Sequence, residues 1–112
     1  MPLDTTTDTR FAADVLESDR PVLVDFTAAW CPPCRMMKPV LEELAAERDD
    51  LRIVTLDVDD NQEAAARYQV LSMPTFVLFR HGAEAARLVG ARPKRRLAAE
   101  LDQVLEQQPA GR

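Results

Sequence analysis

The chain lacks several features that mark particular classes of protein. It has no apolar run close to the roughly 20 residues of a membrane-spanning helix, so we expect no membrane segment. It has no basic excess, because 14 lysines and arginines face 19 acidic residues, and the net charge of −5 argues against nucleic-acid binding. Residues 1–5 lack the basic start and apolar stretch of an export signal, so we expect a cytoplasmic protein.

Length and composition bound the fold. A chain of 112 residues has the size of one domain, and we expect residues 1–112 to form a single domain. Apolar residues make up 46% and charged residues 29%, which is typical of globular rather than disordered chains. At this size folding buries roughly 65% of the surface, which is enough for stability without cross-links or metals.

Cysteine is scarce, and the two copies, Cys31 and Cys34, are separated by only two residues. A disulfide scaffold would spread several cysteines through a short secreted chain. A tetrahedral zinc site needs four ligands, and the chain adds only one histidine, His81, in a predicted exposed hairpin turn. An inert buried pair is the remaining alternative, which two intervening prolines disfavour. We therefore interpret the pair as a redox-active dithiol that exchanges disulfides with other proteins.

The spacing of apolar residues predicts alternating helices and strands. After a short opening strand, the predicted strands cover residues 22–26, 53–58, 75–79 and about 87–89. The predicted helices lie at about residues 11–16, 33–48, from 60 onward, and 97–105. The run at 75–79 is apolar without a break, which indicates a strand buried on both faces.

These elements predict an α/β fold with a mixed central sheet of four to five strands and helices on both faces. Alternation in the first half implies parallel strands joined by right-handed crossovers, whereas the last two strands imply an antiparallel hairpin. The dithiol then falls at the carboxyl end of a strand and the start of a helix. Open α/β sheets place their functional sites there.

Three local expectations accompany this fold. Pro39 lies inside the long helix and should kink it. Asp60 is the expected cap of the next helix, with Glu63 three residues later. The basic cluster at 92–96 would oppose the dipole at the start of the last helix. We interpret that cluster as a solvated face, and a docking patch for an acidic partner is the alternative.

The position of the dithiol supplies its chemistry. The attacking species in disulfide exchange is a thiolate, and a free cysteine with a pKa of about 8.5 is mostly protonated at neutral pH. Unpaired backbone N–H groups and the positive end of the helix dipole stabilise the anion. Cys31 comes first, at the expected exposed edge, so we assign it as the nucleophile. Cys34 lies one turn in and would resolve the mixed disulfide.

Several short motifs occur in the order and spacing of one protein family. They are Val24-Asp25-Phe26, Ala29-Trp30-Cys31, Pro33-Cys34, Pro39, Met73-Pro74-Thr75 and Val89-Gly90. The chain resembles the thioredoxins from about residue 11 to 105. The resemblance implies their three-layer fold and protein-disulfide reductase activity. It implies no bound cofactor, because reducing equivalents would come from NADPH through a flavin-dependent thioredoxin reductase.

The resemblance also implies roles for individual residues. Asp25 resembles the family's buried carboxylate beneath the dithiol. Burial without a partner raises a carboxyl pKa, which suits Asp25 to accept the proton of Cys34. Pro74 resembles the family's cis-proline facing the disulfide, and proline is the residue type that permits a cis peptide bond.

A shallow, mostly apolar groove for oxidised protein substrates is implied beside the dithiol. The backbone of residues 73–75 would pair with an extended substrate segment. Trp30 could pack in the core instead, but a tryptophan beside the nucleophile favours the surface. The implied substrate-binding residues are Trp30, Pro32, Met73, Pro74, Thr75, Gly90 and Ala91.

Three positions depart from the usual thioredoxin pattern. Pro32 replaces the common glycine after the first cysteine, which removes an N–H donor to the Cys31 thiolate and stiffens the loop. Thr27 stands where many members carry a second tryptophan. Thr55 stands where a lysine often neighbours the buried acid, so we predict a higher pKa for Asp25 here than in lysine-bearing relatives.

Three functions are compatible with the sequence. The leading one is a monomeric cytoplasmic disulfide reductase whose partners are thioredoxin reductase and oxidised proteins. The second is an oxidant or isomerase of an oxidising compartment, and the third is a binding module whose redox activity is incidental. Exchange proteins span roughly −270 to −120 mV, and we expect this dithiol at the reducing end.

Overall fold

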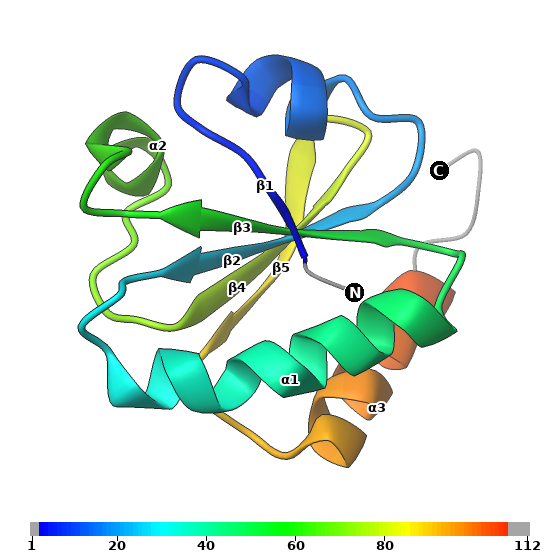
Figure 1. The fold of residues 1–112 in the computed structure, drawn as a ribbon. Coiled ribbons are helices and arrows are strands. Elements are labelled where there is room, and N and C mark those ends of the chain that lie inside the picture. Colours follow the sequence, from blue (N-terminus) through cyan, green and yellow to red (C-terminus); the bar gives the residue numbers. More distant parts are fainter. Residues whose placement is uncertain (1–2, 108–112) are drawn as a thin grey trace.

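The computed structural model describes residues 3–107, which form a five-stranded sheet with helices on both of its faces (Figure 1). The strands are β1 (Asp4–Thr5), β2 (Val22–Thr27), β3 (Arg52–Asp57), β4 (Thr75–Arg80) and β5 (Ala83–Val89). The helices are η1 (Ala12–Leu16), α1 (Pro32–Glu47), α2 (Gln62–Arg67) and α3 (Lys94–Gln107). Helices η1 and α2 lie above the sheet in Figure 1, and α1 and α3 lie below it. The predicted α/β class and the opening strand are therefore confirmed.

The strand order is β1-β3-β2-β4-β5, which places β2 at the centre of the sheet. β1, β3 and β2 run parallel, whereas β4 is antiparallel to both β2 and β5. The β4–β5 hairpin turns at His81 and Gly82, whose φ angles are 54° and 79°. His81 is exposed there, as predicted. Because β4 is antiparallel to β2, the end of β2 that leads to the cysteines meets the start of β4.

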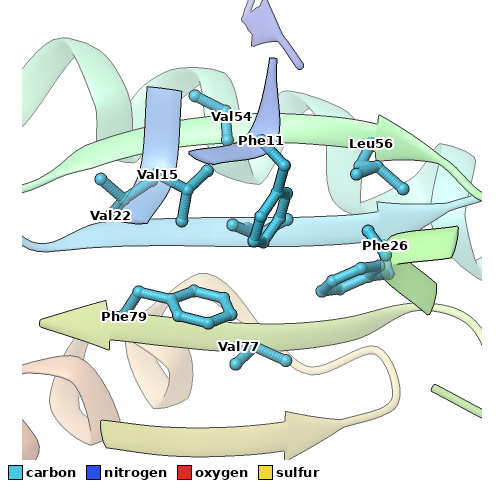
Figure 2. Packing of buried hydrophobic residues seen from close by; sticks show 10 residues of the cluster. Phe11, Val15, Val22, Phe26, Val54, Leu56, Val77 and Phe79 are labelled. Carbon is cyan, nitrogen blue, oxygen red and sulfur yellow. The ribbon is translucent and has the colours of Figure 1, made fainter. Parts of the chain in front are cut away.

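Side chains of β2 alternate between the two faces of the sheet. Val22 and Phe26 pack into the cluster beneath η1 and α2 (Figure 2), and Val24 belongs to the same cluster. Leu23 packs into the opposite cluster with α1 and α3. Full burial of one such side chain stabilises the fold by about 1.5–3 kcal/mol. The same alternation turns Asp25 toward the α1 face, so an acid occupies a position otherwise used for core packing.

Helix α1 carries the dithiol on its first turn and packs through Met37, Leu41 and Leu44. Two prolines occupy its first two positions, where an N–H would have no partner within the helix. The helix continues through Pro39 to Glu47, so the kink at Pro39 stays a prediction.

The cap of α2 differs from the prediction. The helix begins at Gln62, and the preceding Asn61 makes no side-chain cap bond. Instead, Asp8 accepts hydrogen bonds from the N–H groups of Glu63 and Ala64 at 3.1 and 2.9 Å. Asp60 was expected as the cap because it is close in sequence. Tertiary folding brings a carboxylate from 55 residues away to the same donors.

The basic cluster at 92–96 is largely neutralised within the chain. Arg92 and Arg96 both pair with Glu100 of α3. Lys94 pairs with Glu43 and Glu47 of α1. The Lys94 pairs link α3 to α1, and among the described residues Arg95 is the one cation of the cluster without an ion pair. Three of the four cations are therefore engaged, and the structure does not favour a docking patch for acidic partners.

Candidate active site

Cys31 and Cys34 form a disulfide at the start of α1, with their Cα atoms 5.3 Å apart. Cys31 is the N-cap residue, and its Sγ accepts a hydrogen bond from the Cys34 N–H at 3.2 Å. Because Pro32 and Pro33 have no N–H, the Cys34 amide is the first donor that α1 can offer. The same donor, with the positive end of the helix dipole, would stabilise a thiolate at Cys31.

The expectation that Cys31 lies at an exposed edge is wrong for this disulfide state. Each cysteine is only 4% exposed. The pair packs with Ala28, and the side chains of Val58 and Met73 lie against it. These residues come from the loops that follow β3 and precede β4, so the covering contacts are long-range. Exposure therefore does not distinguish the two sulfurs, but their neighbours do.

The neighbour of Cys31 is the segment that leads into β4. Its Sγ lies 3.6 Å from the carbonyl oxygen of Met73. The Met73–Pro74 peptide bond is cis, and the Pro74 carbonyl accepts the Gly90 N–H at 2.9 Å. Thr75 is buried, and its Oγ1 donates to the Ser72 carbonyl at 2.6 Å. Within residues 3–107 the Met73 amide makes no hydrogen bond, whereas Thr75 belongs to the sheet.

Trp30 lies on the other side of Cys31. Its side chain is 62% exposed, and its Nε1–H donates to Asp59 Oδ2 at 2.8 Å. Asp59 follows β3, whereas Met73 precedes β4, and these strands flank β2 on opposite sides. The predicted surface position of Trp30 is confirmed. Together Trp30 and Met73 border the dithiol from two directions.

Asp25 lies in β2, six residues before Cys31, and is 3% exposed. Its Oδ1 has no hydrogen-bond partner among the described residues. Burial raises the pKa of this carboxyl from 3.8 to about 7. Thr55 is its direct neighbour in β3 and supplies no charge that would offset the desolvation. The expected burial of Asp25 is therefore confirmed. A pKa higher than in lysine-bearing relatives stays a prediction, which this burial without a partner supports.

A cavity of about 520 Å³ lies behind the dithiol, on the α1 side of the sheet. Asp25 and Cys34 both line it, and Cys31 does not. The threonines Thr5, Thr27 and Thr55 also line it. The two sulfurs thus differ in their surroundings, because Cys34 shares a cavity with the buried acid and Cys31 contacts the Met73 segment.

The structure does not gather all the predicted docking residues into one groove. Ala91 lines a separate hollow of about 380 Å³ with Met36, Val40 and Pro93. Gly90 contacts Pro74, whereas Trp30 is held by the β3–α2 loop. Pro32 is exposed at the first position of α1.

Sequence reasoning missed three further side chains near this site. Apart from Trp30, the large apolar residues that are exposed within residues 3–107 are Met36, Leu71 and Val89. Met36 is on the first turns of α1, Leu71 precedes Met73, and Val89 pairs with Thr75. All come from segments at the end of the sheet where β2 meets α1. Met36 could have been found, because it lies off the helical spacing of Met37, Leu41 and Leu44.

Residues 3–107 contain neither a metal-binding cluster nor a membrane-spanning helix. No group of three or more histidine, cysteine or acidic side chains is placed to hold a metal ion. No helix in this range is both long and apolar enough to cross a membrane. The cysteine pair itself stores two electrons as the dithiol and releases them when it becomes the disulfide, so its chemistry needs no bound cofactor.

Comparison with known proteins agrees with the site. The thioredoxin family model matches residues 2–103. The chain belongs to the thioredoxin family. Thioredoxin of Mycobacterium tuberculosis is 54% identical over 100 residues, which cover 88% of this chain and 86% of that one. Thioredoxin of Alicyclobacillus acidocaldarius is 47% identical over 103 residues, covering 91% and 97%.

A third relative joins two activities in one protein. The bifunctional thioredoxin reductase/thioredoxin of Mycobacterium leprae is 52% identical over 100 residues, 88% of this chain and 22% of that protein. With the Cys31–Cys34 pair, membership of the thioredoxin family makes this chain a thiol-disulfide oxidoreductase with dithiol-disulfide reductase function.

Proposed function

We propose that Cys31 attacks substrate disulfides, that Cys34 resolves the mixed disulfide, and that Asp25 accepts the proton of Cys34. The observation that carries this assignment is the cavity that joins Asp25 to Cys34 and not to Cys31. A group that receives a proton from Cys34 must reach it without crossing the face where the substrate lies, and the cavity meets that requirement.

In the first step the Cys31 thiolate attacks one sulfur of the substrate disulfide. A Cys31–substrate bond forms, the substrate S–S bond breaks, and the other substrate sulfur leaves as a thiolate. The Cys34 amide, 3.2 Å from Cys31 Sγ in the disulfide, is placed to donate to the attacking thiolate. Pro32 and Pro33 have no N–H groups, so neither can donate a second hydrogen bond to the Cys31 thiolate.

In the second step Cys34 loses its proton to Asp25 and attacks Cys31 Sγ. The Cys31–Cys34 disulfide forms, the bond to substrate breaks, and the second substrate sulfur leaves as a thiolate that takes a proton from solvent. Two electrons have then passed from the protein to the substrate. With its pKa raised to about 7, Asp25 is a much stronger base near neutral pH than an ordinary carboxylate.

Substrate docking is proposed at the border between Trp30 and Met73. The free Met73 amide can pair with an extended substrate backbone, as in strand addition. Pro32, Pro74, Gly90 and Ala91 would contact the flanking substrate residues. Thr75 would act only through its backbone position, because its hydroxyl is used within the protein. The exposed Trp30, Met36, Leu71 and Val89 provide the apolar surface that a protein partner would cover.

The proposed electron donor is a flavin-dependent thioredoxin reductase that uses NADPH. Support comes from the Mycobacterium leprae relative, whose name joins thioredoxin reductase with thioredoxin. A dithiol that depends on NADPH for recharging would work in the cytoplasm. We propose that it does so as a monomer, because Cys31, Cys34, Asp25 and Met73 all come from one chain.

A Cys34→Ser variant tests the order of the cysteines. It should form stable mixed disulfides with oxidised insulin through Cys31, because the resolving thiol is absent. The matched Cys31→Ser variant should form few or none. Equal trapping by the two variants, or trapping only through Cys34, would contradict the assignment. Mass spectrometry of the trapped peptide identifies the cysteine that carries the substrate.

The reduction potential of the dithiol separates a reductase from an oxidant. A value near about −270 mV, with insulin turnover driven by NADPH and a thioredoxin reductase, is the expected result. A value near about −120 mV without turnover would favour an oxidant. Binding of a partner by the reduced wild type, combined with no trapping by Cys34→Ser, would favour a binding module.

A further inference from the structure

Four charged side chains line the cavity behind the dithiol. Asp25 comes from β2, Asp57 from β3, and Arg35 and Lys38 from α1. The residues that line it from the N-terminal segment, Leu3 and Thr5, are uncharged. The charged groups around Asp25 are therefore one further acid and two cations. The contacts of the two cations show which of them could pair with the Asp25 carboxylate when it ionises.

Three of these four groups can be distinguished by their contacts. Arg35 Nη1 donates to the Ala29 carbonyl at 2.8 Å, which holds its guanidinium at the helix start. Asp57 Oδ1 accepts the Asp59 N–H at 2.9 Å. Lys38 makes no hydrogen bond or ion pair with any residue of the described chain. Neither cation forms an ion pair among the described residues, but Arg35 is held by its hydrogen bond to Ala29, so Lys38 is the cation of the cavity wall that is free to move.

Asp25 is the acid of the cavity wall that lacks a partner among the described residues. Its Oδ1 is buried without a partner, and a carboxylate in that position is costly unless it is paired. Lys38 follows Cys34 by four residues on α1, so both lie on the same side of the helix. A lysine ammonium is carried on a flexible four-carbon stem, so its position can change without movement of the backbone.

We propose that Lys38 is the counter-ion of ionised Asp25. Its ammonium enters the cavity when Asp25 gives up its proton and turns back to solvent when Asp25 is protonated. Lys38 is thus a positioning residue that acts through Asp25 and does not touch the sulfurs. The Asp25 proton can then leave through the cavity, and the Lys38 ammonium in the cavity stabilises the ionised carboxylate.

The consequence for turnover rests on the proton-transfer role proposed above, whereas the charge coupling does not. An acceptor of the Cys34 proton must return to its ionised form before the next cycle. A cation that enters the cavity favours that form and lowers the pKa of Asp25 from the level set by burial alone. Failure of the coupling would therefore appear in the Asp25 titration, and failure of the proton-transfer role would appear in the exchange rate.

The two lysines of the chain, Lys38 and Lys94, provide a matched pair of variants. Lys38→Met and Lys94→Met each remove one lysine charge, and Lys94 lies in ion pairs between α3 and α1, outside the cavity wall. The measurement is the carboxyl 13C titration of Asp25 in the reduced wild type, in both variants and in Lys38→Arg. The 15N resonance of the Lys38 ammonium group is followed in the wild type and in Asp25→Asn.

Lys38→Met should raise the Asp25 pKa by about 1 unit relative to Lys94→Met, because an opposite charge at close range typically lowers a carboxyl pKa by 1–3 units. Lys38→Arg should restore the wild-type value. The Lys38 15N shift should report the Asp25 titration in the wild type and lose that inflection in Asp25→Asn. The same Asp25 pKa in Lys38→Met and Lys94→Met would overturn the proposal and leave Lys38 as a solvated side chain or a partner of Asp57.

Discussion

The two faces of the sheet differ most where β2 ends. On the η1 and α2 face, Phe26 is fully buried and completes an apolar cluster with Leu56 and Val77 (Figure 2). On the α1 face, the adjacent residue Asp25 borders a cavity of about 520 Å³. Neighbouring residues of one strand therefore serve opposite purposes, one as core and one as a titratable group.

This contrast shows how a small fold can hold an ionisable site in its centre. The apolar face supplies packing that does not depend on pH. The α1 face gives up a core position to an acid whose ionisation opposes folding. Burying a carboxyl without a partner is tolerated because the rest of both clusters remains tightly packed. Substitutions on the two faces should therefore separate stability from chemistry.

Phe26→Ala should produce the largest loss of stability, about 3–5 kcal/mol, because it removes a fully buried aromatic ring. The pKa of Asp25 should stay unchanged, since Phe26 points to the other face. Phe76→Ala is the matched control, because Phe76 is equally buried and directly opposite Asp25 in β4. It should also lower the Asp25 pKa by admitting water. Urea unfolding and NMR titration measure both effects, and an equal pKa change in both variants would break the contrast.

Asp25→Asn should remove a pH-dependent loss of stability. The folded pKa of about 7 exceeds the unfolded value of 3.8, so the folded state binds the extra proton between these values. Wild-type stability should therefore fall as pH rises from about 4 to 7 and level off above. Between pH 5 and 8 the variant should gain roughly 3 kcal/mol relative to the wild type. Parallel pH profiles from urea unfolding would contradict the raised pKa.

Thr55→Lys should lower the Asp25 pKa by at least about 1 unit, because it places a cation beside the carboxyl. That shift lowers the cost of ionised Asp25 to the free energy of folding by about 1.4 kcal/mol. Thr55→Met is the control of similar length without charge. Should both variants titrate alike at Asp25, the lysine would lie outside the cavity and the charge argument would fail.

Asp8→Ala should have the smallest effect, a loss of about 1 kcal/mol, because it leaves two N–H groups of α2 without their acceptor. The loss belongs to the apolar face, so the Asp25 pKa and the reduction potential should not change. Asp8→Asn keeps an acceptor oxygen and should restore part of the stability. Thermal unfolding of the three proteins is sufficient, and a shifted Asp25 pKa in Asp8→Ala would show that the two faces are coupled.

Local sequence patterns predicted much of this fold. The unbroken apolar run at 75–79 and the helical spacing of Met37, Leu41 and Leu44 gave elements close to β4 and α1. The same patterns placed the dithiol at a strand–helix junction, as the structure has it. These features depend on neighbours within a few residues, so a single sequence records them.

Features that depend on distant contacts could not be predicted in this way. Asp8 caps α2 from 55 residues away in the sequence, and Val58 and Met73 pack against the cysteine pair from two separate loops. The cavity behind Cys34 depends on how α1 lies against β2 and β3. Residue spacing in the sequence does not predict such long-range contacts, and these contacts determine that Cys34 shares the cavity with Asp25.

The pKa of Asp25 in the reduced wild-type protein tests the central claim most directly. The carboxyl 13C resonance of Asp25 should titrate near 7, because the side chain is buried and its Oδ1 lacks a partner. Engagement of Lys38 would lower this value somewhat but keep it well above 3.8. A titration at the ordinary value of 3.8 would contradict the account, since Asp25 could then neither oppose folding at neutral pH nor serve as the proton acceptor of Cys34.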